Sequence, residues 1–328
     1  MKKRTWIPLL IIIIGVCLAL AGFAGGGVKG IKGLWLDRGG FHLTSEDRGN
    51  LIKVDETYDG CSNIEVNVDF INKVTLREGD DFRVRGQNYE RFGGMRVEKN
   101  GSALIVNSTR EGRWLNLDPV NWHGNWNTND CWIEITYPAG SKLDFVAANI
   151  SAGRISVSDI DCGTLRIYND FGDVEVNVAN ANDIIFNLSA GNAKVRSALA
   201  NKIDISNDFG KVDLESTTAN SMTINISSGD VSADTINAGD LFVQSDFGSV
   251  KFERLDISGR GNIKMSAGDV NIGLSMSEDD IDYDLNTELG RVTVDGKSGG
   301  SLSHTSTGSG ASLSINSDFG AITLRFLG

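Results

Sequence analysis

Side chains suited to ligand binding are concentrated in one short stretch between residues 113 and 132. Four of the six tryptophans of the chain lie there: Trp114, Trp122, Trp126 and Trp132. Asparagines and His123 stand between them. Exposed tryptophan rings stack on sugar rings, and neighbouring amides hydrogen-bond to sugar hydroxyls. The four tryptophans are therefore candidate binding residues for a glycan or a protein. The competing interpretation is a small aromatic core beneath a long loop.

The tripeptide Asp-Phe-Gly is a second chemical signal, because protein kinases use it to hold a metal ion. It occurs at Asp170-Phe171-Gly172, Asp208-Phe209-Gly210, Asp246-Phe247-Gly248 and Asp318-Phe319-Gly320. The sequence has neither a glycine-rich nucleotide loop nor a His-Arg-Asp loop, so the recurrence indicates a structural corner. Asn169-Asp170 and Asn207-Asp208 could offer oxygen ligands to calcium, but the nonapeptide of calcium-binding β-rolls is absent. We expect turn residues.

Residues that could carry catalysis are dispersed along the chain. The three histidines are His42, His123 and His304, and this dispersal indicates neither a metal site nor a nucleophilic triad. Enzymes that cleave polysaccharides place carboxylic acids together on one face, whereas outward positions here mix charges of both signs. The sequence therefore predicts a protein that is not an enzyme, without cofactor, catalytic residues or metal ligands.

A glycine that recurs with a 19-residue period defines the elements that carry these motifs. The run is Gly153, Gly172, Gly191, Gly210, Gly229 and Gly248, followed at wider spacing by Gly268, Gly290 and Gly320. Ser-x-Gly and Asp-Phe-Gly corners alternate as far as Gly268. A fixed period of this size is typical of a solenoid, in which each repeat buries its apolar face against its neighbours.

Apolar residues alternate with polar ones after each glycine, as in Val174 and Val176 or Val212 and Leu214. Period two predicts strands with one buried face. A second alternating run precedes the next corner, so we expect two short strands and two turns in each 19-residue unit. The fold class is therefore all-β, a parallel β-solenoid built from 19-residue coils, although a 38-residue coil is the alternative. In a 19-residue coil, each corner phenylalanine stacks over a small residue of the next coil, and we expect it to fill the core.

The chain divides into four parts on this interpretation. Residues 1–24 form a signal anchor with an N-terminal transmembrane helix, residues 25–44 a glycine-rich tether, residues 45–148 an irregular N-terminal β cap, and residues 149–328 the solenoid repeats. A cap is expected because the first coil of a solenoid would otherwise leave an open edge. The segment Gly296–Ser312 is interpreted as a loop that interrupts the last coil and would cover the open end as a lid.

The amino terminus indicates the cellular localisation of the protein. Lys2, Lys3 and Arg4 precede an uncharged stretch over residues 6–24, which is long enough to cross a bilayer core of about 30 Å. Ala19-Leu20-Ala21 matches a cleavage site, but the apolar run continues past it, so we prefer an uncleaved anchor. We expect a single-pass protein of the cell membrane with most of the chain outside the cytoplasm.

The net charge limits the classes of expected partner, and the cysteine content limits the expected disulfides. The net charge is −12, so nucleic acid is not an expected partner. Four cysteines are too few for a disulfide scaffold. Cys61 and Cys131 either pair outside the cytoplasm or remain buried thiols.

A signal-like segment, an irregular β region, a strand ending in Tyr137-Pro138-Ala139-Gly140 and the two repeated corners together resemble the bacterial putative-adhesin family of β-strand-repeat proteins, a domain of unknown function. The resemblance covers roughly residues 45–328. It implies the solenoid fold and offers no catalytic residues. The expected function is non-catalytic binding of an envelope polymer or surface protein. The alternative is an accessory regulator of a cell-envelope stress signalling system.

Overall fold

The computed structural model describes residues 34–37, 40–43, 50–109, 130–306 and 310–328. It divides into two compact units, one of Met1–Gly49 with Glu111–Thr128 and one of Asn50–Arg110 with Asn129–Gly328. In the first unit, β1 (Leu34–Asp37) and β2 (Gly40–Leu43) form an antiparallel pair. The proposed anchor at residues 6–24 lies outside the described residues. Within the described residues, no helix has the length and apolar character needed to span a membrane.

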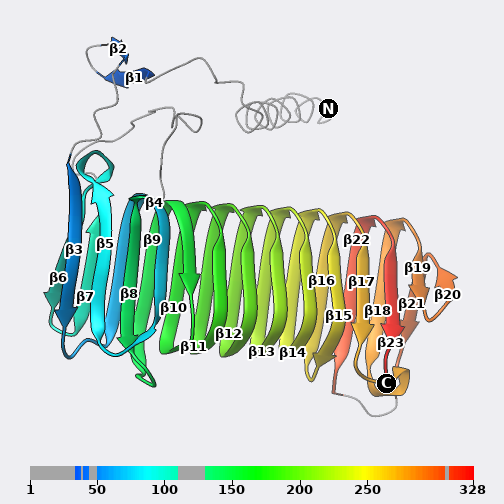
Figure 1. Ribbon diagram of the computed structural model, residues 1–328. Helices are drawn as coiled ribbons and strands as arrows, with labels where there is room; N and C mark the ends of the chain where they lie inside the picture. The colour runs from blue at the N-terminus through cyan, green and yellow to red at the C-terminus, as the bar shows by residue number, and fades with distance from the viewer. Residues whose placement is uncertain (1–33, 38–39, 44–49, 110–129, 307–309) are drawn as a thin grey trace. The chain divides into compact units, whose positions relative to one another are not determined.

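The second unit is a stack of parallel coils (Figure 1). The regular coils are built from β9 (Leu143–Val157), β10 (Ile160–Phe171), β11 (Val174–Ala190), β12 (Ala193–Phe209), β13 (Val212–Ser228) and β14 (Val231–Phe247). Val174 pairs with Ala193, and Ala193 pairs with Val212, so neighbouring coils are offset by one 19-residue period. This confirms the 19-residue coil and excludes the 38-residue one.

Each coil from β11 to β14 is one long strand rather than the two short strands that the sequence suggested. β11 runs without a break through the bend at Ala179-Asn180-Ala181, because inter-coil pairing continues there with Ala198, Leu199 and Ala200. From β11 to β14, only the glycine corner interrupts the strand. The alternating Val, Ile and Leu side chains point inward, and Val174, Val176, Val212 and Ile224 are fully buried. The core is therefore a continuous apolar column along the stack.

The glycine corners pack backbone against backbone. Gly191, at φ 151°, would place an added Cβ only 1.9 Å from the carbonyl oxygen of Gly172. The Gly191 amide in turn donates a hydrogen bond to the Phe209 carbonyl of the next coil, at 2.9 Å. Successive corners can stack at strand spacing only because they lack a side chain.

The corner phenylalanines correct one expectation. Phe171, Phe209, Phe247 and Phe319 are about half exposed, so they do not fill the core as predicted. Each ring does alternate with a small residue, since Phe209 pairs with Ala190 and with Ser228. The strand alternation fails at the corner, where Asp208 and Phe209 are both exposed just before the positive φ of Gly210. The rings therefore lie on the outside of the solenoid.

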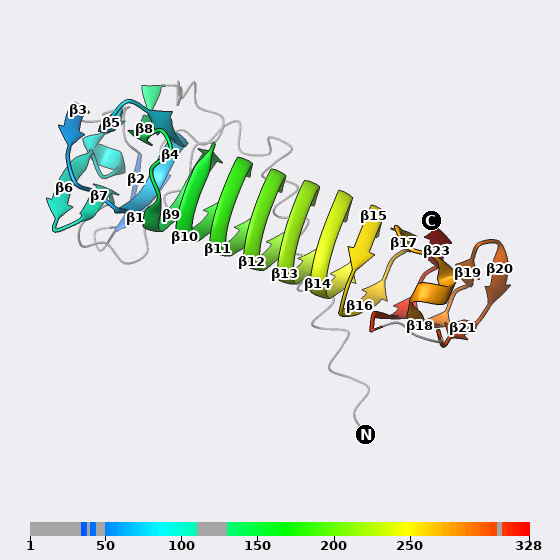
Figure 2. The same ribbon diagram turned by 90° about the horizontal axis from the view of Figure 1, so that it is seen from below.

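The C-terminal end departs from sequence order (Figure 2). After β15 (Val250–Ile257), β16 (Arg260–Ala267) and β17 (Val270–Leu274), a 3-10 turn η3 (Glu278–Asp280) leads to β18 (Asp282–Leu289) and β19 (Val292–Val294). The last coil, β22 (Ser312–Phe319) and β23 (Ile322–Phe326), then inserts between β16/β17 and β18/β19. The coil that is last in sequence is therefore interior in space.

Two short strands close this end. β20 (Lys297–Gly299) pairs antiparallel with β19, and β21 (Ser301–His304) pairs antiparallel with β18. The described part of the segment 296–312 thus covers the outer edge of the final coil, which agrees with the interpretation as a lid. It does so with two strands, so the expectation of a loop was wrong there. Antiparallel strands here occupy backbone groups that would otherwise be open for pairing with another chain.

The N-terminal end repeats this arrangement. The terminal coil is formed by β7 (Ala103–Ser108) and β8 (Trp132–Pro138), and β4 (Asn63–Gly79) lies between it and β9. β5 (Phe82–Tyr89) pairs antiparallel with β8, β3 (Leu51–Tyr58) with β5, and β6 (Arg96–Asn100) with β7. A 3-10 turn η1 (Glu90–Phe92) follows β5. Both ends are therefore capped by antiparallel strands.

Ion pairing joins the cap strands. Glu134 on β8 accepts hydrogen bonds from Arg77 on β4, at 2.7 Å, and from Arg85 on β5. Burial alone would raise the pKa of Glu134, but the bonds from the two guanidinium groups outweigh it and hold the pKa below its usual value. Nearby, the buried Tyr137 donates a 2.6 Å hydrogen bond to the Ser158 carbonyl. These contacts fix the cap to the first coils.

Candidate functional site

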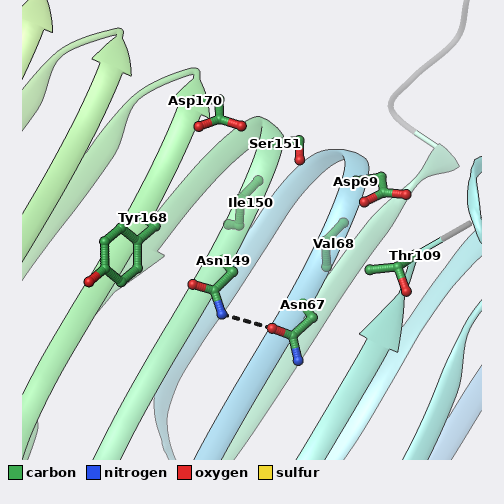
Figure 3. Close-up of a pocket in the computed structure, with 9 residues that line it drawn as sticks. All are labelled: Asn67, Val68, Asp69, Thr109, Asn149, Ile150, Ser151, Tyr168 and Asp170. Carbon is green, nitrogen blue, oxygen red and sulfur yellow. Dashed lines mark hydrogen bonds between the residues drawn. The ribbon is translucent and has the colours of Figure 1, made fainter. Parts of the chain in front are cut away.

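A small surface pocket lies where the cap meets the regular coils (Figure 3). Its volume is about 220 Å³, and its lining residues are Asn67, Val68, Asp69, Thr109, Asn149, Ile150, Ser151, Tyr168 and Asp170. Most of them come from three consecutive coils, those of β4, β9 and β10, and Thr109 follows β7 in the terminal coil. This volume is below the roughly 300–1,000 Å³ of sites that enclose a whole drug-sized ligand. The pocket therefore suits one unit of a larger molecule.

Side-chain amides form one wall of the pocket. Asn149 donates a 2.8 Å hydrogen bond to the side-chain oxygen of Asn67, as Figure 3 shows, and Asn67 donates a 3.1 Å bond to that of Asn107. The strand register aligns Asn107, Asn67 and Asn149 on successive coils. Each amide is thereby fixed in orientation, because its hydrogen-bond partner is set by the neighbouring coil.

Tyr168 lies next to Asn149 in this row, on the following coil. It pairs in register with Asn149, and it is 40% exposed. In Figure 3 the ring lies on the outer face of β10, beside Asn149. A phenol ring here offers an apolar face and a polar hydroxyl at the same place.

Carboxylates mark the corner side of the pocket. Asp69, Ser151 and Asp170 are the residues just before the corner positions Phe70, Ala152 and Phe171, which pair in register. Asp170 is placed by its neighbour Asn169, which is buried and donates a 3.0 Å hydrogen bond to the carbonyl of Gly153. The same bond recurs from Asn207 to Gly191. The two asparagines thus prove to be corner residues, as the sequence predicted.

The chemistry of this lining is that of recognition. Amides, hydroxyls and carboxylates can hydrogen-bond to a polyol, while Tyr168 can pack on an apolar ring face. The lining contains no histidine, cysteine or lysine. Among the residues that the structure describes, no group of three His, Cys, Asp or Glu side chains is arranged to hold a metal ion.

Three of the four tryptophans singled out in the sequence cannot be placed relative to the pocket. Trp114, Trp122 and Trp126 lie outside the described residues. Trp132 begins β8, is partly buried, and pairs with Lys73 on β4 and Gln87 on β5. It does not line the pocket. The assignment of the tryptophans as binding residues stays a prediction.

Sequence reasoning missed the pocket residues. One signal was present, because Asn149 and Tyr168 are separated by the 19-residue period and must occupy the same outward position on adjacent coils. No such signal exists for Asn67, which lies far earlier in the chain than its partner Asn149, in an aperiodic region.

The three cysteines that the structure describes are buried thiols. Cys61, Cys131 and Cys162 are all buried and do not form the disulfide considered for Cys61 and Cys131. Burial raises the pKa of Cys61, and it raises the pKa of Cys162 to about 12. Thiols with a raised pKa are poor nucleophiles at neutral pH, which favours a packing role.

The stacked 19-residue coils and their antiparallel caps define a capped parallel β-solenoid. A sequence model of the family described as Toastrack DUF4097 matches residues 61–325. Since this is most of the chain, the protein belongs to that family.

Solved structures similar to this chain include three from species of Bacteroides and Parabacteroides. One is described as a putative adhesin from Bacteroides fragilis, with 12% identity, TM-score 0.41, and coverage of 85% of this chain and 97% of the other. A second, from Parabacteroides merdae, has 9% identity, TM-score 0.39, and the same coverage. A third, from Parabacteroides distasonis, has 10% identity and TM-score 0.37, and covers 85% of this chain and 98% of the other. No curated protein matches.

Proposed function

We propose that this protein is a non-catalytic adhesin that is anchored in the cell membrane by residues 6–24 and binds a glycan of the cell envelope outside the cytoplasm. The observation that carries the proposal is the pocket in which the fixed amides of Asn67 and Asn149 adjoin the exposed ring of Tyr168. The similar structures are described as putative adhesins, which names a class of function and no ligand.

The pocket chemistry favours a sugar over other small ligands. Amide rows bind hydroxyls through both donor and acceptor atoms, and the adjoining aromatic face removes apolar sugar surface from water. The site is small and open, so one or two sugar rings of a longer chain would bind weakly. Useful affinity would come from several contacts on one polymer.

The test is binding of envelope-derived oligosaccharides to the full-length protein in detergent micelles, first on a glycan array and then by calorimetry. Tyr168→Ala should lower affinity about tenfold or more, because the ring supplies the apolar contact. The matched control is Gln244→Ala, since Gln244 occupies the same outward column four coils away and is exposed. Equal affinity in the two variants would contradict the proposal.

The same preparation tests the remaining sequence predictions. Trp122→Ala and Trp126→Ala should weaken glycan binding only if those tryptophans contribute to the site. Recovery of a membrane signalling protein in a pull-down, with no oligosaccharide bound, would favour the alternative function as an envelope-stress regulator. Membrane fractionation of a variant that lacks residues 6–24 should release the protein from the membrane fraction.

A further inference from the structure

The exposed corner phenylalanines form a regular row along one edge of the solenoid. We call Phe171, Phe209, Phe247 and Phe319, each with the aspartate that precedes it, the corner ladder. Their exposed fractions are 51%, 49%, 62% and 55%. Consecutive rings are two coils apart, with Ala190, Ser228 or Ala267 at the coil between. At about 4.8 Å per coil, the rings repeat roughly every 9.6 Å.

The alternation of phenylalanine with a small corner residue continues between neighbouring coils even where it stops along the sequence. After Gly268, the next corner along the chain is Glu288-Leu289-Gly290, which lacks a phenylalanine. The inserted last coil instead places Phe319 beside Ala267, two coils from Phe247. The chain thereby keeps the two-coil repeat of its rings across the break in order. Such regular spacing is expected if the row of exposed rings has a function.

The aspartates of the ladder carry negative charge that no described basic side chain pairs with. In the part of the chain that the structure describes, no hydrogen bond or ion pair involves the side chains of Asp170, Asp208, Asp246 and Asp318. Some carboxylates on the coil faces are paired, by contrast, as in Lys194 with Glu215 at 2.8 Å and Arg196 with Glu175 at 3.0 Å. The ladder charges are about one Debye length apart in 0.1 M salt. Their negative potentials therefore overlap and favour a cationic ligand.

We propose that the corner ladder binds a basic, proline-rich peptide in the polyproline II conformation. This helix has three residues per turn and a rise of about 3.1 Å, so equivalent side chains repeat roughly every 9.3 Å. Over the three intervals of the ladder, the mismatch accumulates to only about 1 Å. Two turns of an α-helix repeat roughly every 10.8 Å and would drift by about 3.6 Å. Alternate residues of a β-strand repeat at about 6.8 Å, so a β-strand ligand would not match even the spacing between the first two rings.

The recognition chemistry agrees with the spacing. Proline rings of a polyproline II ligand pack on exposed aromatic side chains, as in other domains that bind this conformation. An arginine or lysine in each triplet would meet the adjoining carboxylate. This ligand thus satisfies both members of each Asp-Phe unit along the ladder.

Two other occupants fit less well. A second copy of this chain could seat its rings over Ala190 and Ser228, but it would bring two rows of aspartates together in a protein of net charge −12. A neutral glycan could stack on the rings but would leave the carboxylates without counter-charge. Both serve as outcomes of the test.

The experiment measures fluorescence anisotropy of labelled (Pro-Pro-Arg)4 with the full-length protein in detergent micelles. The double variant Phe209→Ala/Phe247→Ala should raise Kd about tenfold or more, because it removes two central rings. Asp208→Asn/Asp246→Asn preserves the shape of the ladder, and it should weaken binding and flatten its salt dependence. The matched control is Leu199→Ala, since Leu199 is 55% exposed at the opposite bend of the coil. Circular dichroism checks that each variant folds.

Peptide variants test the repeat. A (Pro-Pro-Arg)4 peptide with one glycine inserted at its centre breaks the register and should bind more weakly, and (Pro-Pro-Glu)4 should not bind. Tyr168→Ala removes the ring of the glycan site, which shares only Asp170 with the corner ladder, and it should leave peptide binding unchanged. Three results would each overturn it: an unchanged Kd in both double variants, ladder-dependent binding of a neutral oligosaccharide without peptide binding, or ladder-dependent dimerisation without peptide binding.

Discussion

At the scale of single residues, the corner glycine is fixed by a contact with its own counterpart in the preceding coil. A Cβ on Gly210 would lie 1.9 Å from the Gly191 carbonyl oxygen, and the φ of 133° is unfavourable for other residues. Because both atoms in the clash belong to close-packed backbone, neither can move without separating two coils. At this position of the corner, any side chain would therefore clash with the backbone of the preceding coil.

We predict that Gly210→Ala lowers the free energy of unfolding by at least about 2–3 kcal/mol, combining backbone strain with steric overlap. Urea unfolding followed by circular dichroism measures this change. Gly300→Ala is the control, since an added Cβ there meets no atom within 4 Å, and its midpoint should stay near that of the wild type. A midpoint for Gly210→Ala as high as the control's would mean that the corner adjusts.

At the scale of strands, the cap depends on charge as well as on pairing. Glu134 joins β8 to β4 and β5 through Arg77 and Arg85. Its pKa is lowered in the folded state, so its contribution to stability is full above the pKa of the unfolded chain and is lost as the pH falls through the folded value. This ion group is partly buried and should be worth more than the exposed pairs on the coil faces.

We predict that Glu134→Gln lowers stability by about 1–2 kcal/mol at pH 7. The difference from the wild type should shrink in acid, because the wild-type carboxyl then becomes protonated as well. Thermal unfolding midpoints measured between pH 7 and pH 3 check this. Asp55→Asn, which removes the exposed partner of Arg83, should shift the midpoint less. A gap that stays constant with pH would show that ionisation of Glu134 is irrelevant.

The strands also show how far sequence reasoning reaches. The 19-residue period predicted the coil, its parallel pairing and its inward Val and Ile side chains, because one repeated register satisfies every coil. The outward position of Phe209 was missed, since period two holds along a strand and breaks at a corner where φ turns positive. The spatial order of the last coils could not be predicted from the sequence either. An Ala267 corner can stack on any Asp-Phe-Gly corner, and the sequence does not say which.

At the scale of the whole solenoid, stability against association depends on its two covered ends. The outer edge of β18 and β19 would present unpaired backbone groups without β20 and β21. Solenoids generally need such caps to remain monomeric.

We predict that replacing residues 297–306 with a short Gly-Ser linker makes the protein associate end to end. Light scattering should show a mass that rises with protein concentration, whereas the wild type stays constant over the same range. As a control, a Gly-Ser replacement of residues 307–310, which leaves β20 and β21 intact, should leave the mass unchanged. Equal masses for the uncapped variant and this control would show that the edge is protected in another way.

The insertion of β22 and β23 between earlier coils has a consequence for biosynthesis. A ribosome delivers the chain from its amino terminus, so residues 282–294 emerge before the segment that must separate them from residues 260–274. Until residues 312–326 arrive, the C-terminal end cannot close in its final order. A chain that stops short of residue 312 would lose an internal layer rather than its tip, and such truncated products would be exposed to proteases instead of accumulating as shortened copies.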